Sequence, residues 1–155
     1  MALLVRARTA TAQGMVAAIV LVLAFGNQAF TEWVGHHTRP GTVPGWFARV
    51  LSWPSWAFGP TSRDLLAHDL RALLLLAFTG LVLIMAAPSS DGAATLVVGW
   101  AALVLGSALA AFVTTFLTTN ATLLGAFDAA AQGSGYGLFA GWIVGIAAVA
   151  AQSED

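Results

Sequence analysis

Long apolar runs recur along the chain and constrain its fold more than any other feature. They cover residues 14–30, 73–85, 94–118 and 135–151, and none of them contains a charged residue. A membrane helix needs roughly 20 predominantly apolar residues to cross a hydrocarbon core about 30 Å thick. Four separated runs are too many for one signal peptide. The sequence therefore predicts an all-α, polytopic membrane protein that forms one domain over residues 1–155.

The scarcity of charge excludes several classes of function. Only 8% of the 155 residues are charged and 59% are hydrophobic, whereas a soluble domain is about 25% charged. The chain has six basic residues, all Arg, and seven acidic ones, so it lacks the cationic surface that binds nucleic acid. The absence of Cys excludes disulfides, thiolate nucleophiles and Cys-based metal sites. We expect no cofactor.

Turn and capping signals suggest where the helices begin and end. We predict four membrane helices over residues 14–33, 62–87, 93–118 and 135–151. Thr61 and Asp64 have the spacing of a capping box before the second helix, and Pro88 follows its end. The mildly apolar stretch 120–132 is expected to be a short surface helix or a re-entrant piece.

The loop between the first two predicted helices, residues 34–61, is rich in aromatic residues. Three Trp and two Phe lie within residues 45–58, and such rings favour the headgroup layer of a bilayer. One interpretation is a short helix in the membrane interface that ends by Pro54. The other is a Trp-rich loop that packs on the helix bundle.

Small residues recur at every fourth position in the last two predicted helices. One set is Gly133, Gly137, Gly141 and Gly145, and the other is Ala102, Gly106 and Ala110, continued by Thr114. In lipid, helices associate where small residues allow their backbones to approach closely. These faces pack on each other within one subunit, or they form an interface with another copy or another membrane protein.

A polar series follows the first apolar run. Gln28, Glu32 and His36 are spaced by four residues, and Asn27 precedes them. Polar groups at such depth are costly unless they find partners. They form a proton or cation site, or they are a capped helix end in which Glu32 pairs with Arg39 or Arg71.

A metal site has only weak support from the sequence. His36, His37, His68 and Asp64 are of ligand type, and Asp64 and His68 share a helix face. No third ligand is fixed by this spacing.

No set of residues for nucleophilic or acid–base catalysis can be assembled from the sequence. We therefore expect a non-catalytic accessory or assembly subunit of a larger membrane complex. The alternative is a homo-oligomeric channel or transporter with a polar path near Asn27, Gln28 and Glu32.

The composition, without Lys and rich in Ala, Gly, Leu and Val, suggests a bacterial plasma membrane. The Arg-containing tail before the first helix favours cytoplasmic termini.

Overall fold

The computed structural model describes residues 2–56, 63–86, 91–117 and 121–151, and for residues 2–8 and 63–65 it describes the backbone alone. These residues form six helices and, within the ranges given, no strand. The helices are α1 (Ala2–Phe25), α2 (Gln28–His37), α3 (Val43–Leu51), α4 (Arg63–Ala86), α5 (Gly92–Thr115) and α6 (Leu123–Ala150).

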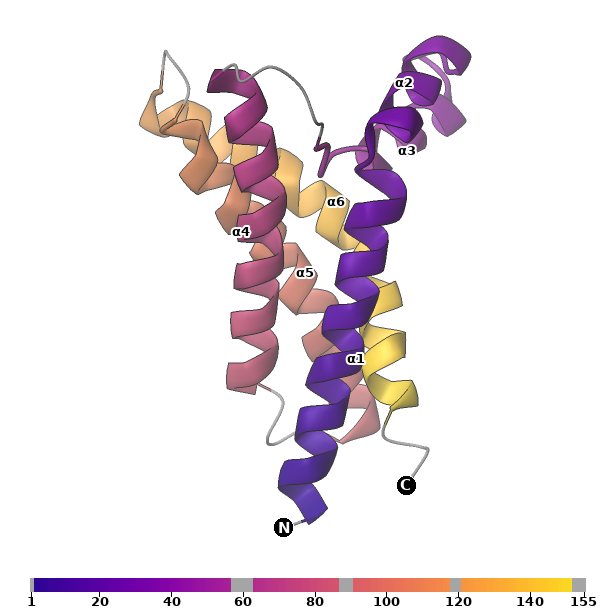
Figure 1. Cartoon of the computed structure of the whole chain (residues 1–155), viewed down its shortest axis with the longest axis vertical. Coiled ribbons are helices and arrows are strands. Elements are labelled where there is room, and N and C mark those ends of the chain that lie inside the picture. The colour runs from indigo at the N-terminus through magenta and orange to yellow at the C-terminus, as the bar shows by residue number, and fades with distance from the viewer. Residues whose placement is uncertain (1, 57–62, 87–90, 118–120, 152–155) are drawn as a thin grey trace.

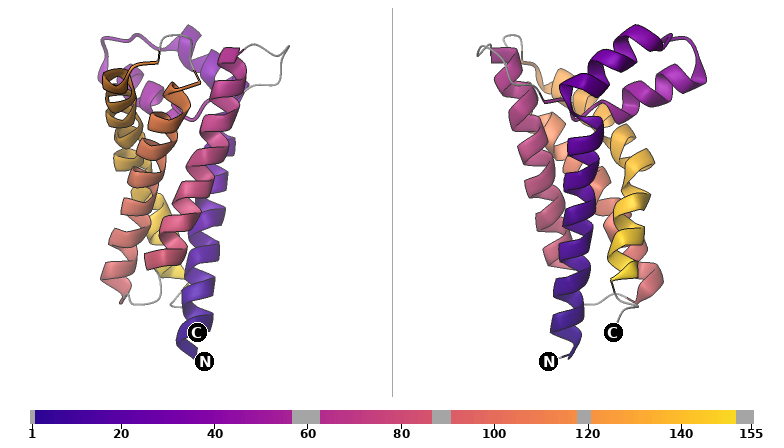
Figure 2. Two further views of the ribbon diagram at one scale, coloured as in Figure 1. Left: turned by 90° about the vertical axis from the view of Figure 1, so that its left-hand side faces the viewer. Right: turned by 45° about the vertical axis from the view of Figure 1, so that its right-hand side comes forward.

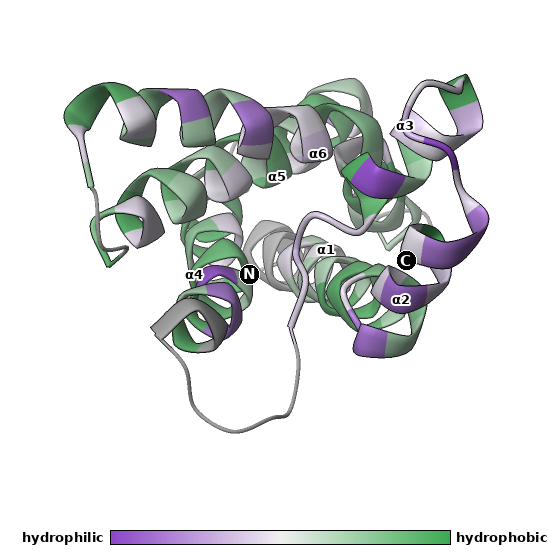
Figure 3. Cartoon of the chain, turned by 90° about the horizontal axis from the view of Figure 1, so that it is seen from above, coloured by the Kyte–Doolittle hydropathy of each residue, from purple (hydrophilic) through white to green (hydrophobic). Residues whose placement is uncertain are grey.

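The four long helices form a bundle and the two short ones form an arm. Helices α1, α4, α5 and α6 run side by side, and the start of α1 and the end of α6 lie at the same end (Figure 1). Helices α2 and α3 project sideways from the opposite end, beyond α1 and α6 (Figure 2). We call residues 28–51 the arm. Seen from above, the arm carries many of the hydrophilic residues, whereas the bundle is mostly hydrophobic (Figure 3).

Three helices are long and apolar enough to cross a membrane. They cover Leu66–Ala86, Gly92–Thr115 and Leu123–Ala150, and a fourth span results only if the bent pair Thr9–Phe25 and Gln28–His37 is counted as one. The structure thus supports an all-helical, multi-pass membrane architecture with three or four spans. The prediction of four continuous spans is met for three of them.

The first predicted helix, 14–33, is not continuous. It breaks after Phe25 and the chain turns by 52° into α2. The Asn27 side chain explains the break: it donates to the carbonyls of Leu23 at 3.0 Å and Ala24 at 2.7 Å, and it accepts from the Phe30 amide at 2.8 Å. One side-chain amide therefore hydrogen-bonds to two carbonyls at the end of α1 and caps the start of α2.

The last helix begins earlier than predicted, at Leu123 instead of near Gly135. The Thr122 hydroxyl accepts from the Gly125 amide at 3.0 Å and caps this start. The stretch 120–132 is therefore mostly the beginning of α6, not a separate surface helix or re-entrant segment. Helix α5 begins after Asp91, whose carboxylate accepts from the Ala94 amide at 2.8 Å. The predicted capping residue Thr61 lies outside the described residues.

Residues 34–56, the described part of the predicted loop 34–61, are not an irregular loop throughout. They contain the end of α2 and the helix α3, which is capped by Thr42 and has Pro44 in its first turn. The chain leaves α3 before Pro54 and returns to the bundle, where the Trp56 amide donates to the Gly26 carbonyl at 2.8 Å. A short helix and a bundle-packed aromatic segment therefore coexist here.

Candidate functional site

The four glycines of α6 that are spaced four residues apart lie against the backbone of α5. A Cβ atom added to Gly133 would come within 2.6 Å of the Ser107 carbonyl oxygen, and one added to Gly141 within 2.7 Å of the Trp100 carbonyl oxygen. Gly137 and Gly145 approach the backbone of Val104 and Leu96 in the same way. These glycines therefore serve a contact inside the subunit.

The small residues of α5 divide between two neighbouring helices. Gly99 lies against Gly145 of α6, whereas Gly106 lies against α4, where an added Cβ would come within 2.9 Å of the Thr79 amide nitrogen. Ala102 and Ala110 are fully buried. Helix α5 is thus in contact with α4 and α6 through small residues on both sides.

The polar series after the first apolar run lies on the arm, outside the bundle. Asn27 caps α2 as described above, and the Gln28 side-chain amide donates to the Glu32 carboxylate at 2.8 Å. His36 and His37 are exposed, and His37 stacks on Trp33 at 5.4 Å between ring centroids. In the described residues Glu32 forms no ion pair with Arg39 or Arg71. These residues are therefore not placed to line a path through the bundle.

The histidines and carboxylates do not gather in one place. Among the described residues, no group of three or more His, Asp or Glu is close enough to hold a metal ion. The His68 imidazole hydrogen-bonds to the Ser55 hydroxyl at 2.8 Å. The side chain of Asp64 lies outside the described residues.

A cluster that the sequence analysis missed lies where the arm joins the bundle. The ring of Trp53 stacks on the buried ring of Tyr136, with centroids 5.8 Å apart, and the guanidinium carbon of Arg71 lies 5.3 Å from the Trp53 centroid. The Arg71 Nε group also donates to the Thr114 hydroxyl at 3.5 Å. Trp53 thus joins α4 and α6 at this end. The concentration of Trp was the sequence signal, but it did not say which ring packs against the core.

Hydroxyl groups inside the bundle mostly bond to their own helix. Thr114 donates to the Ala110 carbonyl at 2.8 Å and Ser107 to the Leu103 carbonyl at 2.7 Å, which is the usual behaviour in membrane helices. Within the part of the chain that the structure describes, the buried hydroxyls of Thr79 and Tyr136 have no hydrogen-bond partner.

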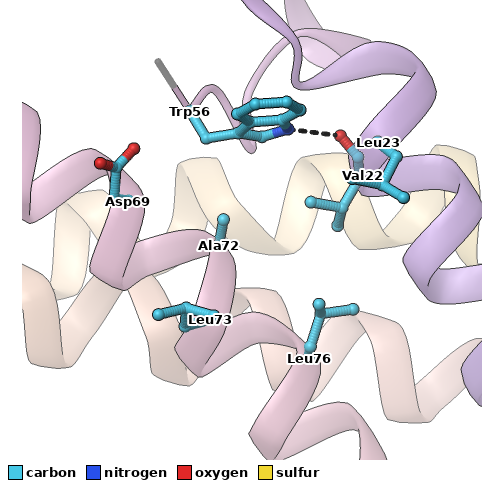
Figure 4. Close-up of a pocket in the computed structure, with 7 residues that line it drawn as sticks. All are labelled: Val22, Leu23, Trp56, Asp69, Ala72, Leu73 and Leu76. Atoms are coloured by element: carbon cyan, nitrogen blue, oxygen red, sulfur yellow. Dashed lines mark hydrogen bonds between the residues drawn. The ribbon is translucent and has the colours of Figure 1, made fainter. Parts of the chain in front are cut away.

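An open groove separates the upper halves of α1 and α4 (Figure 4). It has a volume of about 350 Å³ and is lined by Val22, Leu23, Trp56, Asp69, Ala72, Leu73 and Leu76. The Trp56 ring spans the end nearest the arm, where its Nε1 group donates to the Val22 carbonyl at 3.1 Å. The groove is apolar apart from the Asp69 carboxylate near the same end.

A second pocket, of about 370 Å³, lies between α3 and α6. It is lined by Trp46, Arg49, Val50, Trp53, Ala131, Gln132 and Gly135. This pocket combines a guanidinium group and a side-chain amide with two indole rings.

Comparisons with protein-family models, with curated proteins and with solved structures find no match for this chain.

Proposed function

We propose that this chain is a non-catalytic accessory or assembly subunit of a larger membrane complex, and that its arm is the docking element. The observation that supports the proposal is the exposed apolar surface of the arm. Val43 is 81% exposed and Trp33 is 51% exposed, and both belong to helices that lie outside the bundle. Aromatic side chains with this exposure are typical of the anchors of protein interfaces.

The arm is held in a fixed direction, as a docking element requires. Phe25 of α1 contacts Phe30 of α2 edge to face at 5.3 Å, and Phe30 in turn lies 6.2 Å from Trp33. Trp46 of α3 contacts Phe139 of α6 at 5.3 Å. Because both arm helices are braced by aromatic contacts, docking would order few additional side chains and would lose little entropy.

The small-residue faces contribute to this function only indirectly. Gly141 lies against Trp100 of α5, so Gly141→Leu changes the fold of the subunit and does not report on a partner. The arm offers a cleaner test, because Val43 is the first residue of α3 and is almost fully exposed.

The test compares Val43→Asp with Glu32→Gln, another arm variant, by native mass spectrometry of gently extracted membranes. We expect the unaltered chain and the Glu32 variant to appear in an assembly with other subunits. The Val43 variant should lose at least about tenfold of that assembly, because a charge is placed in a contact that excludes water. Circular dichroism of both variants checks that their helix content is unchanged.

Two outcomes would overturn the proposal. A protein that is monomeric in its own membrane has no complex to serve. A closed homo-oligomer whose ion flux in proteoliposomes falls in Glu32→Gln would instead support a channel.

A further inference from the structure

The pocket between α3 and α6 has a polar side and an apolar side. Arg49 and Gln132 supply the polar groups, and Val50, Ala131 and Gly135 supply apolar surface. Trp46 and Trp53 provide indole rings that are apolar in body and polar at the ring nitrogen. The lining thus suits a ligand that is charged at one end and apolar at the other.

The charge at this pocket favours an anion. Within the described ranges no carboxylate pairs with the guanidinium group of Arg49. Arg71 does not line the pocket; it contacts the Trp53 ring and donates to the Thr114 hydroxyl. The Asp128 carboxylate accepts from the Gln132 side-chain amide at 2.9 Å but does not line the pocket.

The walls of the pocket are preorganised. Trp46 is held by its edge-to-face contact with Phe139, and Trp53 is held by its contacts with Tyr136 and Arg71. A ligand would therefore meet rings that already occupy their positions, which reduces the entropy lost on binding.

The position of the pocket matches the headgroup layer of a bilayer. Helix α6 has 28 residues and is about 42 Å long, longer than a hydrocarbon core of about 30 Å. Its polar residues Asp128 and Gln132 lie in its first part, at the end of the bundle from which the arm projects (Figure 1), so this part lies toward the water. Indole rings beside an arginine at this depth are typical of sites for lipid headgroups.

We propose that this pocket binds the phosphate group of a membrane phospholipid. Arg49 donates charge-assisted hydrogen bonds to the phosphate oxygens, which is the geometry that guanidinium groups favour. Trp46 and Trp53 pack against the glycerol and the first carbons of the acyl chains. The site does not depend on a protein partner, and a free phosphate ion shares only the polar half of this chemistry.

The test is native mass spectrometry of the delipidated full chain in detergent, titrated with phosphatidylglycerol. We expect one tightly bound lipid, and a loss of about tenfold in affinity for Arg49→Gln, because one charge-assisted interaction is removed. Arg39→Gln is the matched control, since Arg39 is an exposed arginine of the arm that does not line the pocket. Gln132→Ala is a second pocket variant and should weaken binding less.

Inorganic phosphate distinguishes the two sources of the anion. Millimolar phosphate should not displace the lipid, because it gains nothing from the indole walls. Displacement by phosphate that is equally sensitive to Arg49→Gln would overturn the lipid as ligand. Equal lipid affinity in Arg49→Gln and Arg39→Gln would overturn the site itself.

Discussion

Along the α5–α6 contact, glycines bring two backbones together, whereas along the upper α1–α4 contact, larger side chains leave an open groove. An added Cβ on Gly137 would meet the backbone nitrogen of Val104 at 2.7 Å. By contrast, a Cβ added to Gly14 of α1 or to Gly80 of α4 would meet only side-chain atoms. The nearest are those of Leu83 at 3.1 Å for Gly14 and of Met15 at 3.0 Å for Gly80. In lipid, burying apolar side chains gives little driving force, so close backbone approach decides which helices hold together.

This difference has a consequence for where the molecule can change. The α5–α6 contact leaves no room for a larger side chain, while the groove between α1 and α4 already contains about 350 Å³ of open space. Helix α1 also continues into the arm through the break at Asn27. We therefore expect the bundle to tolerate change at α1–α4 and to resist it at α5–α6.

The largest effect is expected for Gly137→Leu. Its side chain cannot fit against Val104, so the two helices must separate, and the free energy of unfolding should fall by about 3 kcal/mol, the upper end of the usual cost of overpacking. Gly135→Leu on the same helix is the control, because an added Cβ there meets nothing within 4 Å. Thermal unfolding in detergent measures both. Equal melting temperatures for the two variants would show that the close contact does not stabilise the bundle.

The sequence predicted that one face of α6 packs closely, but it did not predict which small residues of α5 this face meets. The four-residue period of Gly133 to Gly145 marked a face of α6 for close packing, because only small residues permit it. The α5 series that contains Gly106 was expected to face these glycines or a partner, but Gly106 lies against Thr79 of α4. The α5 glycine that lies against α6 is Gly99, which is outside that series. One helix can thus present small residues to two neighbours, and the spacing alone does not say which neighbour each face meets.

Other features depended on contacts between distant residues. The residue pair Gly26 and Asn27 is a local signal for a helix break, but the apolar run around it favoured a continuous helix. The break is stabilised by Trp56, which follows the arm in the sequence and whose backbone amide donates to the Gly26 carbonyl. Likewise, only the fold shows that Trp53 packs against the core while Trp33 stays exposed.

A smaller effect is expected when a leucine replaces either of two buried alanines, and the two losses of unfolding free energy should differ. Ala102 of α5 is 0% exposed and Ala72 of α4 is 6% exposed, but only Ala72 lines the groove. Ala102→Leu should overpack the bundle and lower the free energy of unfolding by about 2 kcal/mol. Ala72→Leu should change it by less than about 1 kcal/mol, because the added carbons enter open space (Figure 4). Denaturation of both variants in the same detergent is the measurement, and a larger loss for Ala72→Leu would reverse the comparison.

The smallest effect is expected for Trp56→Phe, at the arm end of the groove. The change removes the hydrogen bond from the Trp56 Nε1 group to the Val22 carbonyl, which also accepts from the Gly26 amide at 2.9 Å. Because that carbonyl keeps a partner, the loss should be only about 0.5–1 kcal/mol. It should be local: hydrogen exchange should quicken in residues 22–28 and stay unchanged in α5 and α6. Faster exchange throughout the bundle would mean that α1 is coupled to the α5–α6 contact more tightly than the groove suggests.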